Sequence, residues 1–286
     1  MLNRRTTGSV VCPSCGSLVG VRDDKCYQCG RANPGLWGFG PVLRHIGADF
    51  GFGPMVIGAC ITLWAITVLM SGSAMHMDGI TSLLSPSTPI LFLFGASGAV
   101  PVFRYGRWWT VLSAGWLHAG LLHIFMNMYW IRMMGPAIAE LFGPARTVII
   151  YTVAGVTGFA LSSLAGAFLG GLPIPFLRGG SFTVGASAPL FGLIGALYHY
   201  GRTSSSIIKQ QAMSIVLQAA VFGLLVPGID NYAHLGGFAG GYLTSAFLNP
   251  MKRERGDHMI IALVCLVATA LSIIASIITG LPLFRS

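Results

Sequence analysis

Apolar residues form seven long stretches along this chain, separated by short polar or glycine-rich segments. A helix needs about 20 apolar residues to cross the hydrocarbon core of a membrane. The fourth and sixth stretches are shorter than the others and rich in glycine. The pattern predicts seven transmembrane helices, at about residues 53–71, 114–134, 147–169, 185–200, 206–226, 229–248 and 259–281.

Composition supports an all-α polytopic membrane protein in the lipid bilayer. Only 9% of the 286 residues are charged, and the mean hydropathy is +0.73, whereas a soluble domain carries about 25% charged residues. The net charge of +9 would suit a nucleic-acid partner, but the distribution of the 17 Lys and Arg residues fits a membrane topology better. We therefore expect no nucleic acid.

The basic residues also predict an orientation. With a cytoplasmic N-terminus, thirteen of them fall in inside segments, and four fall outside: Arg104, Arg107, Arg178 and Arg285. Such an excess of Lys and Arg is typical of cytoplasmic segments. With seven spans, the C-terminus would lie on the outer side.

Four of the six cysteines lie in one short polar segment as two C-x-x-C pairs: Cys12, Cys15, Cys26 and Cys29. Two such pairs can surround one tetrahedral zinc ion, and the glycine after each pair permits the turn that directs backbone N–H groups at sulfur. The segment resembles a zinc ribbon with a structural Zn²⁺. Two disulfides are the alternative, which the predicted reducing side disfavours. Cys60 and Cys265 lie in apolar stretches, as small hydrophobic residues do.

These features divide the chain into four parts. We predict a cytoplasmic zinc-ribbon-like segment at 1–34, a linker at 35–51, a core of six transmembrane helices at 52–250, and a basic loop with a seventh helix at 251–286. A closed site of four cysteines has no open position for chemistry. The ribbon is therefore expected to serve structure or to bind a protein partner.

Polar side chains within apolar stretches are costly to bury in a membrane and tend to be functional. Three stretches carry them: His118, His123 and Asn127 in the second, Ser187 in the fourth, and Asn231 and His234 in the sixth. With the predicted orientation, these spans all run from outside to inside. His118, His123, Ser187 and His234 then fall within the first three turns, at a similar depth, which predicts a shared cavity open to water.

Small residues indicate that two of these spans approach closely. One face of the fourth span carries Gly185, Ala188, Gly192 and Gly195, and the sixth carries two small-xxx-small pairs, Gly236/Gly240 and Gly237/Gly241. Such faces allow close helix packing, so Ser187 and His234 could meet.

The residue types predict nucleophilic catalysis. Neutral imidazole suits removal of a serine proton near pH 7, so we interpret Ser187 and His234 as a catalytic dyad. Asp230 is better placed as a helix N-terminal residue than as a partner of the imidazole. His123 and Asn127, together with the Ser187 N–H, could stabilise an oxyanion. Ser97 lies in a similar Gly-Ala-Ser-Gly segment, but no glycine-faced helix follows it.

Together, these residues resemble those of a rhomboid intramembrane serine protease over about residues 50–250. WLHAGLLHIFMNM matches the family's H-x4-H-x3-N element, GASAPLFGLIGAL its G-x-S motif and AHLGGFAGG its A-H-x-x-G-x-x-x-G helix. Glu140, Gly143 and Arg146 are similar to its E-x-x-x-G-x-x-R element. The resemblance implies Ser187 as nucleophile, His234 as base, and His123, Asn127 and the Ser187 amide as oxyanion donors. It also places Phe191 beside the catalytic histidine, with His118 and Asn231 in supporting positions.

The resemblance further implies a six-helix core, here with a seventh helix added, and single-span membrane proteins as substrates, cut near the outer face. Two positions depart from the pattern. Ala188 replaces the glycine usual after the nucleophile, and Trp109 stands where the first loop usually has arginine, which puts the anchoring of that loop in doubt.

Two other function classes are compatible with a polytopic membrane protein. A non-catalytic rhomboid-like scaffold would bind transmembrane helices, with the ribbon as adaptor, but such scaffolds usually lack the serine or the histidine. A secondary transporter would show charged pairs at the midplane or an inverted repeat, and neither is visible in this sequence.

Overall fold

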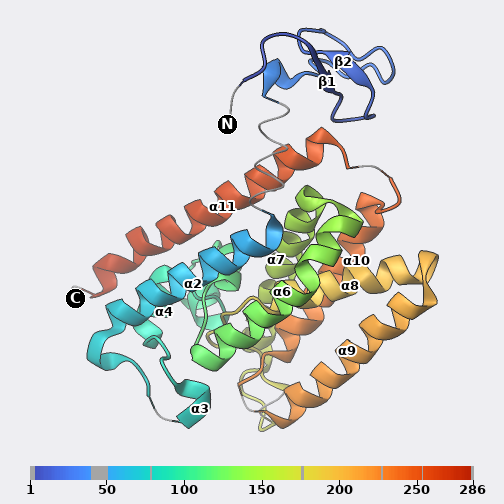
Figure 1. The fold of residues 1–286 in the computed structure, drawn as a ribbon. Coiled ribbons are helices and arrows are strands. Elements are labelled where there is room, and N and C mark those ends of the chain that lie inside the picture. Colours follow the sequence, from blue (N-terminus) through green and yellow to red (C-terminus); the bar gives the residue numbers. More distant parts are fainter. Residues whose placement is uncertain are drawn as a thin grey trace.

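The computed structural model describes residues 4–39, 51–77, 79–174, 177–226, 228–252 and 254–284. A small β-unit at the N-terminus precedes a large helical region (Figure 1). Most of the predicted linker 35–51 lies outside the described residues. So do Arg44, Arg253 and Arg285, which the predicted orientation also uses.

The N-terminal unit is a short antiparallel hairpin of β1, Ser9–Val11, and β2, Leu18–Gly20, in which Val10 pairs with Val19. A 3-10 turn, η1, follows at Leu36–Gly38. The buried core of this N-terminal unit consists of three valines and cysteine side chains. Because a core of this size supplies little hydrophobic stabilisation, a bound metal ion would be the main source of its stability.

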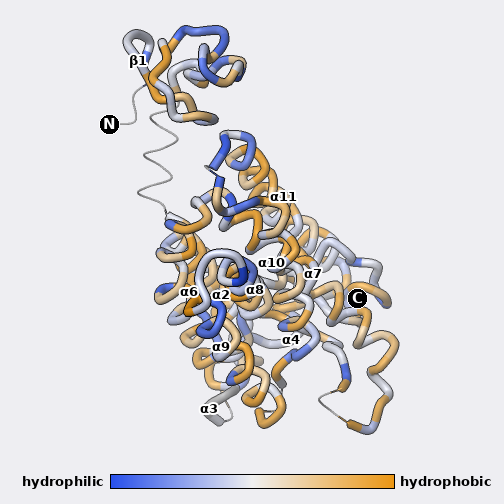
Figure 2. The backbone as a smooth tube through the Cα atoms, turned by 90° about the vertical axis from the view of Figure 1, so that its right-hand side faces the viewer, coloured by the Kyte–Doolittle hydropathy of each residue, from blue (hydrophilic) through white to orange (hydrophobic). Residues whose placement is uncertain are grey.

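The helical region contains one long helix for each of the seven apolar stretches. They are α2, Phe52–Ser71; α6, Leu121–Phe142; α7, Pro144–Leu169; α8, Ser187–Ser204; α9, Ser206–Leu225; α10, Asn231–Leu248; and α11, Gly256–Gly280. Hydrophobic positions dominate these helices, whereas hydrophilic ones gather in the β-unit and in turns between helices (Figure 2). The prediction of an all-α polytopic membrane protein is confirmed.

These helices differ in how closely they match a membrane span in length and hydropathy. Among the described residues, the spans at Phe52–Ala74, Pro144–Leu169, Ser206–Leu225 and Gly256–Leu283 are long and apolar enough, and a bent pair ending in α6 makes up to five. The two remaining helices, α8 and α10, have 18 residues each. At 1.5 Å per residue they are about 27 Å long, slightly less than the membrane core. They pack against each other and against α7, so protein rather than lipid surrounds much of their surface.

Glycine allows the backbones of α8 and α10 to approach. A Cβ atom at Gly237 would overlap the carbonyl oxygen of Ala188, and one at Gly241 would overlap that of Gly192. On the other side of α10, Gly236 and Gly240 face Thr157 of α7. The two small-xxx-small pairs predicted for this helix therefore pack against two different helices, α8 and α7.

The second predicted span differs from the structure at its start. Its helix α6 begins at Leu121 rather than at 114, after an approximately perpendicular bend of 90°. Gly120 permits this bend because its φ of 145° lies in a region that favours glycine. His118 consequently lies in the segment before α6, not in the first turns of a span.

Residues 72–120 between α2 and α6, here called loop one, are largely built from short helical segments. These are η2, Gly72–Ala74; α3, Gly79–Ser82; α4, Thr88–Phe94; a π-helical turn η3, Val100–Arg104; α5, Thr110–Ser113; and η4, Ala114–Trp116. A last turn, η6, Leu281–Phe284, follows α11. The segment with Pro86 and Pro89, which precedes Ser97, is partly helical because Pro89 lies in the first turn of α4.

Loop one is anchored even though Trp109 replaces the expected arginine. Arg107 is 2% exposed and donates hydrogen bonds to the carbonyl oxygens of Phe92, at 2.7 Å, and Ser276, at 2.5 Å. Its guanidinium also lies 4.1 Å from the centre of the Phe92 ring. Burial lowers the pKa of Arg107 to about 10, so the side chain stays charged near neutral pH.

We predict that Gly241→Ala lowers the free energy of unfolding by about 1–3 kcal/mol, because the methyl group overlaps the backbone of α8. Gly58→Ala in α2 is the matched control, since its Cβ would meet nothing within 4 Å and alanine favours helix. Unfolding of both variants in detergent measures the difference. Equal stability of the two variants would contradict the close approach.

Candidate active site and metal centre

Ser187 and His234 lie within hydrogen-bond distance of each other. Ser187 is the first residue of α8, and His234 lies in the first turn of α10. The His234 Nε2 atom is 2.9 Å from the Ser187 Oγ atom. The glycine contacts that join α8 and α10 therefore bring a serine hydroxyl and an imidazole together.

Phe191 fixes the plane of the His234 ring. Their rings are stacked, with centroids 4.1 Å apart and an interplanar angle of 9°. Asp230 does not contact this imidazole through a hydrogen bond of the described residues. It caps α10 by accepting the Ala233 N–H at 3.0 Å, and its other oxygen accepts from the Ser162 hydroxyl, as expected for a helix N-terminal residue. Aromatic stacking thus orients the histidine, while the carboxylate orients its helix.

His123 directs one ring nitrogen toward the serine. The Ala119 N–H donates to His123 Nδ1 at 3.3 Å, which assigns the proton of the neutral ring to Nε2. A Cβ atom built on Gly185 would be 2.6 Å from that Nε2 and 3.8 Å from Ser187 Oγ. Glycine at 185 therefore leaves free the space between an N–H donor and the Ser187 hydroxyl.

Asn127 lies one turn after His123 on α6 and is buried. Its amide nitrogen donates to the His123 carbonyl oxygen at 2.9 Å. A side-chain amide has two N–H groups, so this bond leaves a second donor. The spacing of four residues places both side chains on the same face of the helix.

His118 and Asn231 support the surroundings of the pair instead of contacting it. The Ala186 N–H, directly before the serine, donates to His118 Nε2 at 3.4 Å. The amide nitrogen of Asn231 donates to the Gly223 carbonyl oxygen near the end of α9, at 3.1 Å. His118 thus holds the turn before α8, and Asn231 joins α10 to α9.

Ser97 occupies a structural position. It is fully buried, its hydroxyl lies 3.4 Å from that of Ser163, and it accepts from the Thr110 hydroxyl at 3.3 Å. Its backbone exchanges two hydrogen bonds with Thr183, at 3.0 and 2.8 Å. Ser97 therefore joins loop one to the segment before α8, and none of these contacts involves a base.

A second Ser–His pair escaped the sequence analysis. His199 Nδ1 of α8 lies 3.0 Å from the hydroxyl of Ser245 on α10. Both residues lie about three turns after Ser187 and His234, so the same helix contact produces both pairs. Ser245 is completely buried, which suits an interhelical hydrogen bond. Its one signal in the sequence is this parallel spacing.

Comparison with known proteins identifies the helical region. The profile of the rhomboid domain matches residues 105–251, just over half of the chain. The chain belongs to the rhomboid family. Its departure at Ala188 is accommodated within the fold, since the methyl group faces Gly158 of α7.

Several curated proteins resemble this rhomboid chain. RHOMBOID-like protein 4 of Arabidopsis thaliana is 34% identical over 56% of this chain and 39% of the relative. Rhomboid protease GluP of Bacillus subtilis is 30% identical over 65% of this chain and 35% of the relative. Inactive RHOMBOID-like protein 8 of Arabidopsis thaliana is 28% identical over 54% and 42%. The chain spans between about a third and a half of these relatives.

The four N-terminal cysteines form a second candidate site. Their sulfur atoms all lie within 4.8 Å of one another, with Cys12 3.8 Å from Cys29 and Cys15 3.5 Å from Cys26. A tetrahedral ion with metal–sulfur bonds of about 2.3 Å separates its ligands by about 3.8 Å. The sulfurs are free thiols, and the set has the geometry to hold one metal ion.

Two similar turns shape this cluster. Gly16 and Gly30 have φ values of 79° and 71°, and their N–H groups donate to the carbonyl oxygens of Cys12 and Cys26. Hydrogen bonds to Ser17 lower the pKa of Cys15 to about 6. A hydrogen bond to the Arg31 backbone lowers the pKa of Cys29, but desolvation and the neighbouring cysteines raise it to about 12. Cys15 is therefore the thiol that loses its proton more readily of the two, and binding of a metal ion would release the proton of Cys29.

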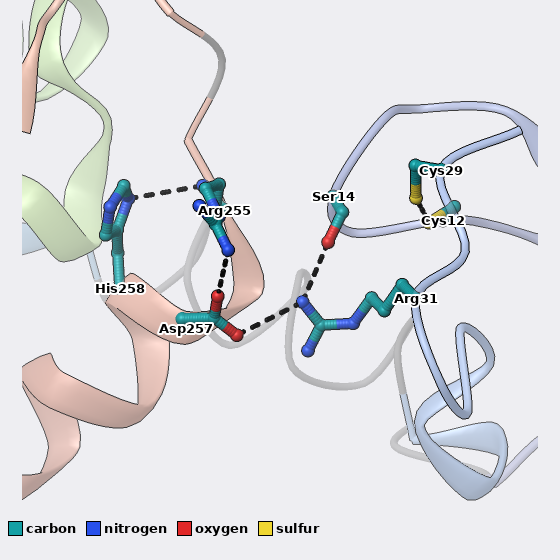
Figure 3. A network of polar contacts seen from close by, with 7 residues as sticks. All are labelled: Cys12, Ser14, Cys29, Arg31, Arg255, Asp257 and His258. Atoms are coloured by element: carbon teal, nitrogen blue, oxygen red, sulfur yellow. Dashed lines mark hydrogen bonds and ion pairs between the residues drawn. The ribbon is translucent and has the colours of Figure 1, made fainter. Parts of the chain in front are cut away.

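The β-unit contacts the start of α11 beside this cluster. Figure 3 shows Arg31 between the two parts. Its guanidinium donates to the Ser14 hydroxyl at 2.8 Å and lies 3.4 Å from the Asp257 carboxylate. Asp257 also pairs with Arg255 at 2.8 Å. Because these pairs are partly exposed, each contributes at most about 1 kcal/mol.

We predict that the purified protein holds about one metal ion per chain, and that Cys26→Ser removes most of it because a ligand is lost. Elemental analysis together with thiol titration measures this. Cys265→Ser in α11 is the control and keeps the metal. Native protein that lacks metal and contains two disulfides would contradict the site.

Proposed function

We propose that this rhomboid protein is an intramembrane serine endopeptidase that uses Ser187 as nucleophile and His234 as general base. The observation that carries the proposal is the distance of 2.9 Å between Ser187 Oγ and His234 Nε2, in a family that includes the protease GluP. The substrates would be transmembrane segments of membrane proteins.

In the proposed reaction, His234 Nε2 takes the hydroxyl proton as Ser187 Oγ attacks the carbonyl carbon of the scissile peptide bond. The imidazolium then gives this proton to the leaving amine, which leaves an acyl-serine. A water molecule, deprotonated by the same nitrogen, hydrolyses the ester and regenerates the hydroxyl. With Asp230 engaged at the helix terminus, stacking on Phe191 orients the base.

The negative charge that develops on the carbonyl oxygen needs donors. The proposed donors are the Nε2–H of His123, the second N–H of Asn127 and the backbone N–H of Ser187. The space beside Gly185, bordered by His123 Nε2 and Ser187 Oγ, supports this assignment. The oxyanion would lie there.

The remaining assignments follow from the sequence. We propose a cytoplasmic N-terminus and an outer C-terminus, with cleavage near the outer face. The division is a zinc ribbon at 1–34, a linker at 35–51, a protease core at 52–250 and an additional region at 251–286. The ribbon's ion would be structural Zn²⁺, which four thiolates select, and the ribbon would serve a protein partner.

We expect Ser187→Ala and His234→Ala each to abolish cleavage of a labelled single-span substrate in liposomes, because nucleophile and base are lost. Ser97→Ala and Ser245→Ala remove buried hydroxyls outside the proposed site and should keep cleavage. A substrate that binds the native protein and stays intact would favour the scaffold function. Cleavage that survives Ser187→Ala would exclude the dyad.

We further expect Gly185→Ala to lower kcat by at least about 100-fold, as loss of an oxyanion donor does. The methyl group would fill the space beside His123 Nε2, and alanine is strained at the φ of 129° found at this position. Initial rates against the same substrate measure kcat. A variant with native kcat would place the oxyanion elsewhere.

A further inference from the structure

The seventh helix carries three of its four hydroxyl side chains, Thr269, Ser272 and Ser276, on its buried face. The buried residues of α11 are Gly256, Ala262, Thr269, Ser272, Ser276 and Gly280, and this helix packs against α4, α5 and α7 (Figure 1). Large apolar residues on its other positions, such as Leu263 and Ile278, are exposed. Hydroxyl groups in membrane helices form hydrogen bonds with neighbouring segments. The contacts of the buried serines therefore show which segment the inward face of α11 binds.

Both serines bind loop one at Trp109. The indole Nε1 of Trp109 donates to the Ser276 hydroxyl at 3.1 Å, and the Ser272 hydroxyl donates to the Trp109 carbonyl oxygen at 2.7 Å. Arg107 adds a bond to the Ser276 carbonyl oxygen. One residue of loop one is therefore held through its side chain and its backbone by a helix more than 160 residues later.

Trp109 leads directly into the candidate active site. It precedes α5, and the short helical run α5–η4 begins immediately after it. The carbonyl oxygen of Ala114 in this run accepts the N–H of Gly185 at 2.9 Å. Gly185 borders the space between His123 and Ser187, so five residues of helical chain connect Trp109 to the proposed oxyanion position.

A second set of bonds joins the same two segments. Besides the paired bonds of Ser97 and Thr183, the N–H groups of Ala99 and Val100 donate to the carbonyl oxygens of Gly180 and Ser181, at 2.8 and 3.1 Å. Loop one and the segment before α8 therefore behave as one unit. α11 contacts loop one at Arg107 and Trp109, which lie between residues 97–100 and Ala114 along the chain.

We propose that Trp109, Ser272 and Ser276 are positioning residues for the protease reaction. By holding the start of α5, they fix the Ala114 carbonyl, and this carbonyl fixes the Gly185 turn beside the nucleophile. None of the three touches the reacting atoms. The inference rests on the proposed protease function and assigns to α11 a part in catalysis.

The test compares Trp109→Phe, Ser276→Ala and the double variant in cleavage of a labelled single-span substrate. Each single variant removes the same indole–hydroxyl bond while keeping most of the packing. We expect kcat to fall roughly 5- to 50-fold, as small displacements of reacting groups do, with KM within about twofold. The double variant should match the single ones, because the two groups act through one bond.

Thr279→Ala is the matched control on α11, because its hydroxyl bonds only carbonyl oxygens of its own helix among the described residues, Ala275 and Ser276. Its kcat should be native. Hydrogen exchange of residues 180–186 adds a readout that needs no activity. Exchange should be faster in Trp109→Phe and Ser276→Ala than in the native protein, and unchanged in Thr279→Ala.

The outcomes separate the two proposals. A native protein that cleaves nothing refutes the protease function, whatever the exchange data show. A native protein that cleaves, together with single variants of unchanged kcat and unchanged exchange at 180–186, overturns the positioning role. Additive losses in the double variant overturn it as well, since they assign the two groups to independent effects.

Discussion

The close approach of α8 and α10 is the constraint on which the candidate site depends. Ser187 starts one helix and His234 lies in the first turn of the other, so their distance follows from the separation of the two backbones. Glycines 237 and 241 set that separation, because any side chain there would overlap α8. On the far side, α7 meets α10 at Gly236 and Gly240. The glycine faces of α10 are thus covered by α7 and α8, whereas Leu235, Leu243 and Phe247 on its remaining surface are exposed.

Loop one contains irregular backbone near the membrane, and its polar backbone groups need hydrogen-bond partners. Such backbone is tolerated where its polar groups are bonded within the protein. Here the segments 97–100 and 180–183 bond each other, and Ala114 bonds Gly185. The buried charge of Arg107 is likewise shared between carbonyl oxygens of Phe92 and Ser276. The same bonds that satisfy the backbone also fix the turn before Ser187.

The sequence predicted what depends on local pattern. Apolar length identified seven helices, and two C-x-x-C pairs with glycines identified the cysteine cluster. The predicted start of the second span was wrong, because the apolar run in the sequence continues through the bend at Gly120. The contact of Asn231 with α9 could not be predicted, because the direction of a side-chain amide depends on packing. The roles of Arg107 and Trp109 could not be predicted, because their partner Ser276 lies more than 160 residues away. The assigned roles of Ser187 and His234 stay predictions.

The helices that carry the candidate catalytic residues differ in hydropathy from the helices around them. This difference accounts for the presence of the seventh helix, α11. The helices with the candidate catalytic residues, α8 and α10, are less apolar than a typical membrane span, whereas α2, α7, α9 and α11 are long and apolar enough to cross a membrane. Helices that carry serine, histidine and asparagine need others to shield them from lipid. α11 has the highest hydropathy of the four and turns its apolar residues outward. Its inward face, however, offers hydroxyl groups to loop one. A helix that only shielded the core would need no such groups, so α11 is an integral part of the structure that holds the site.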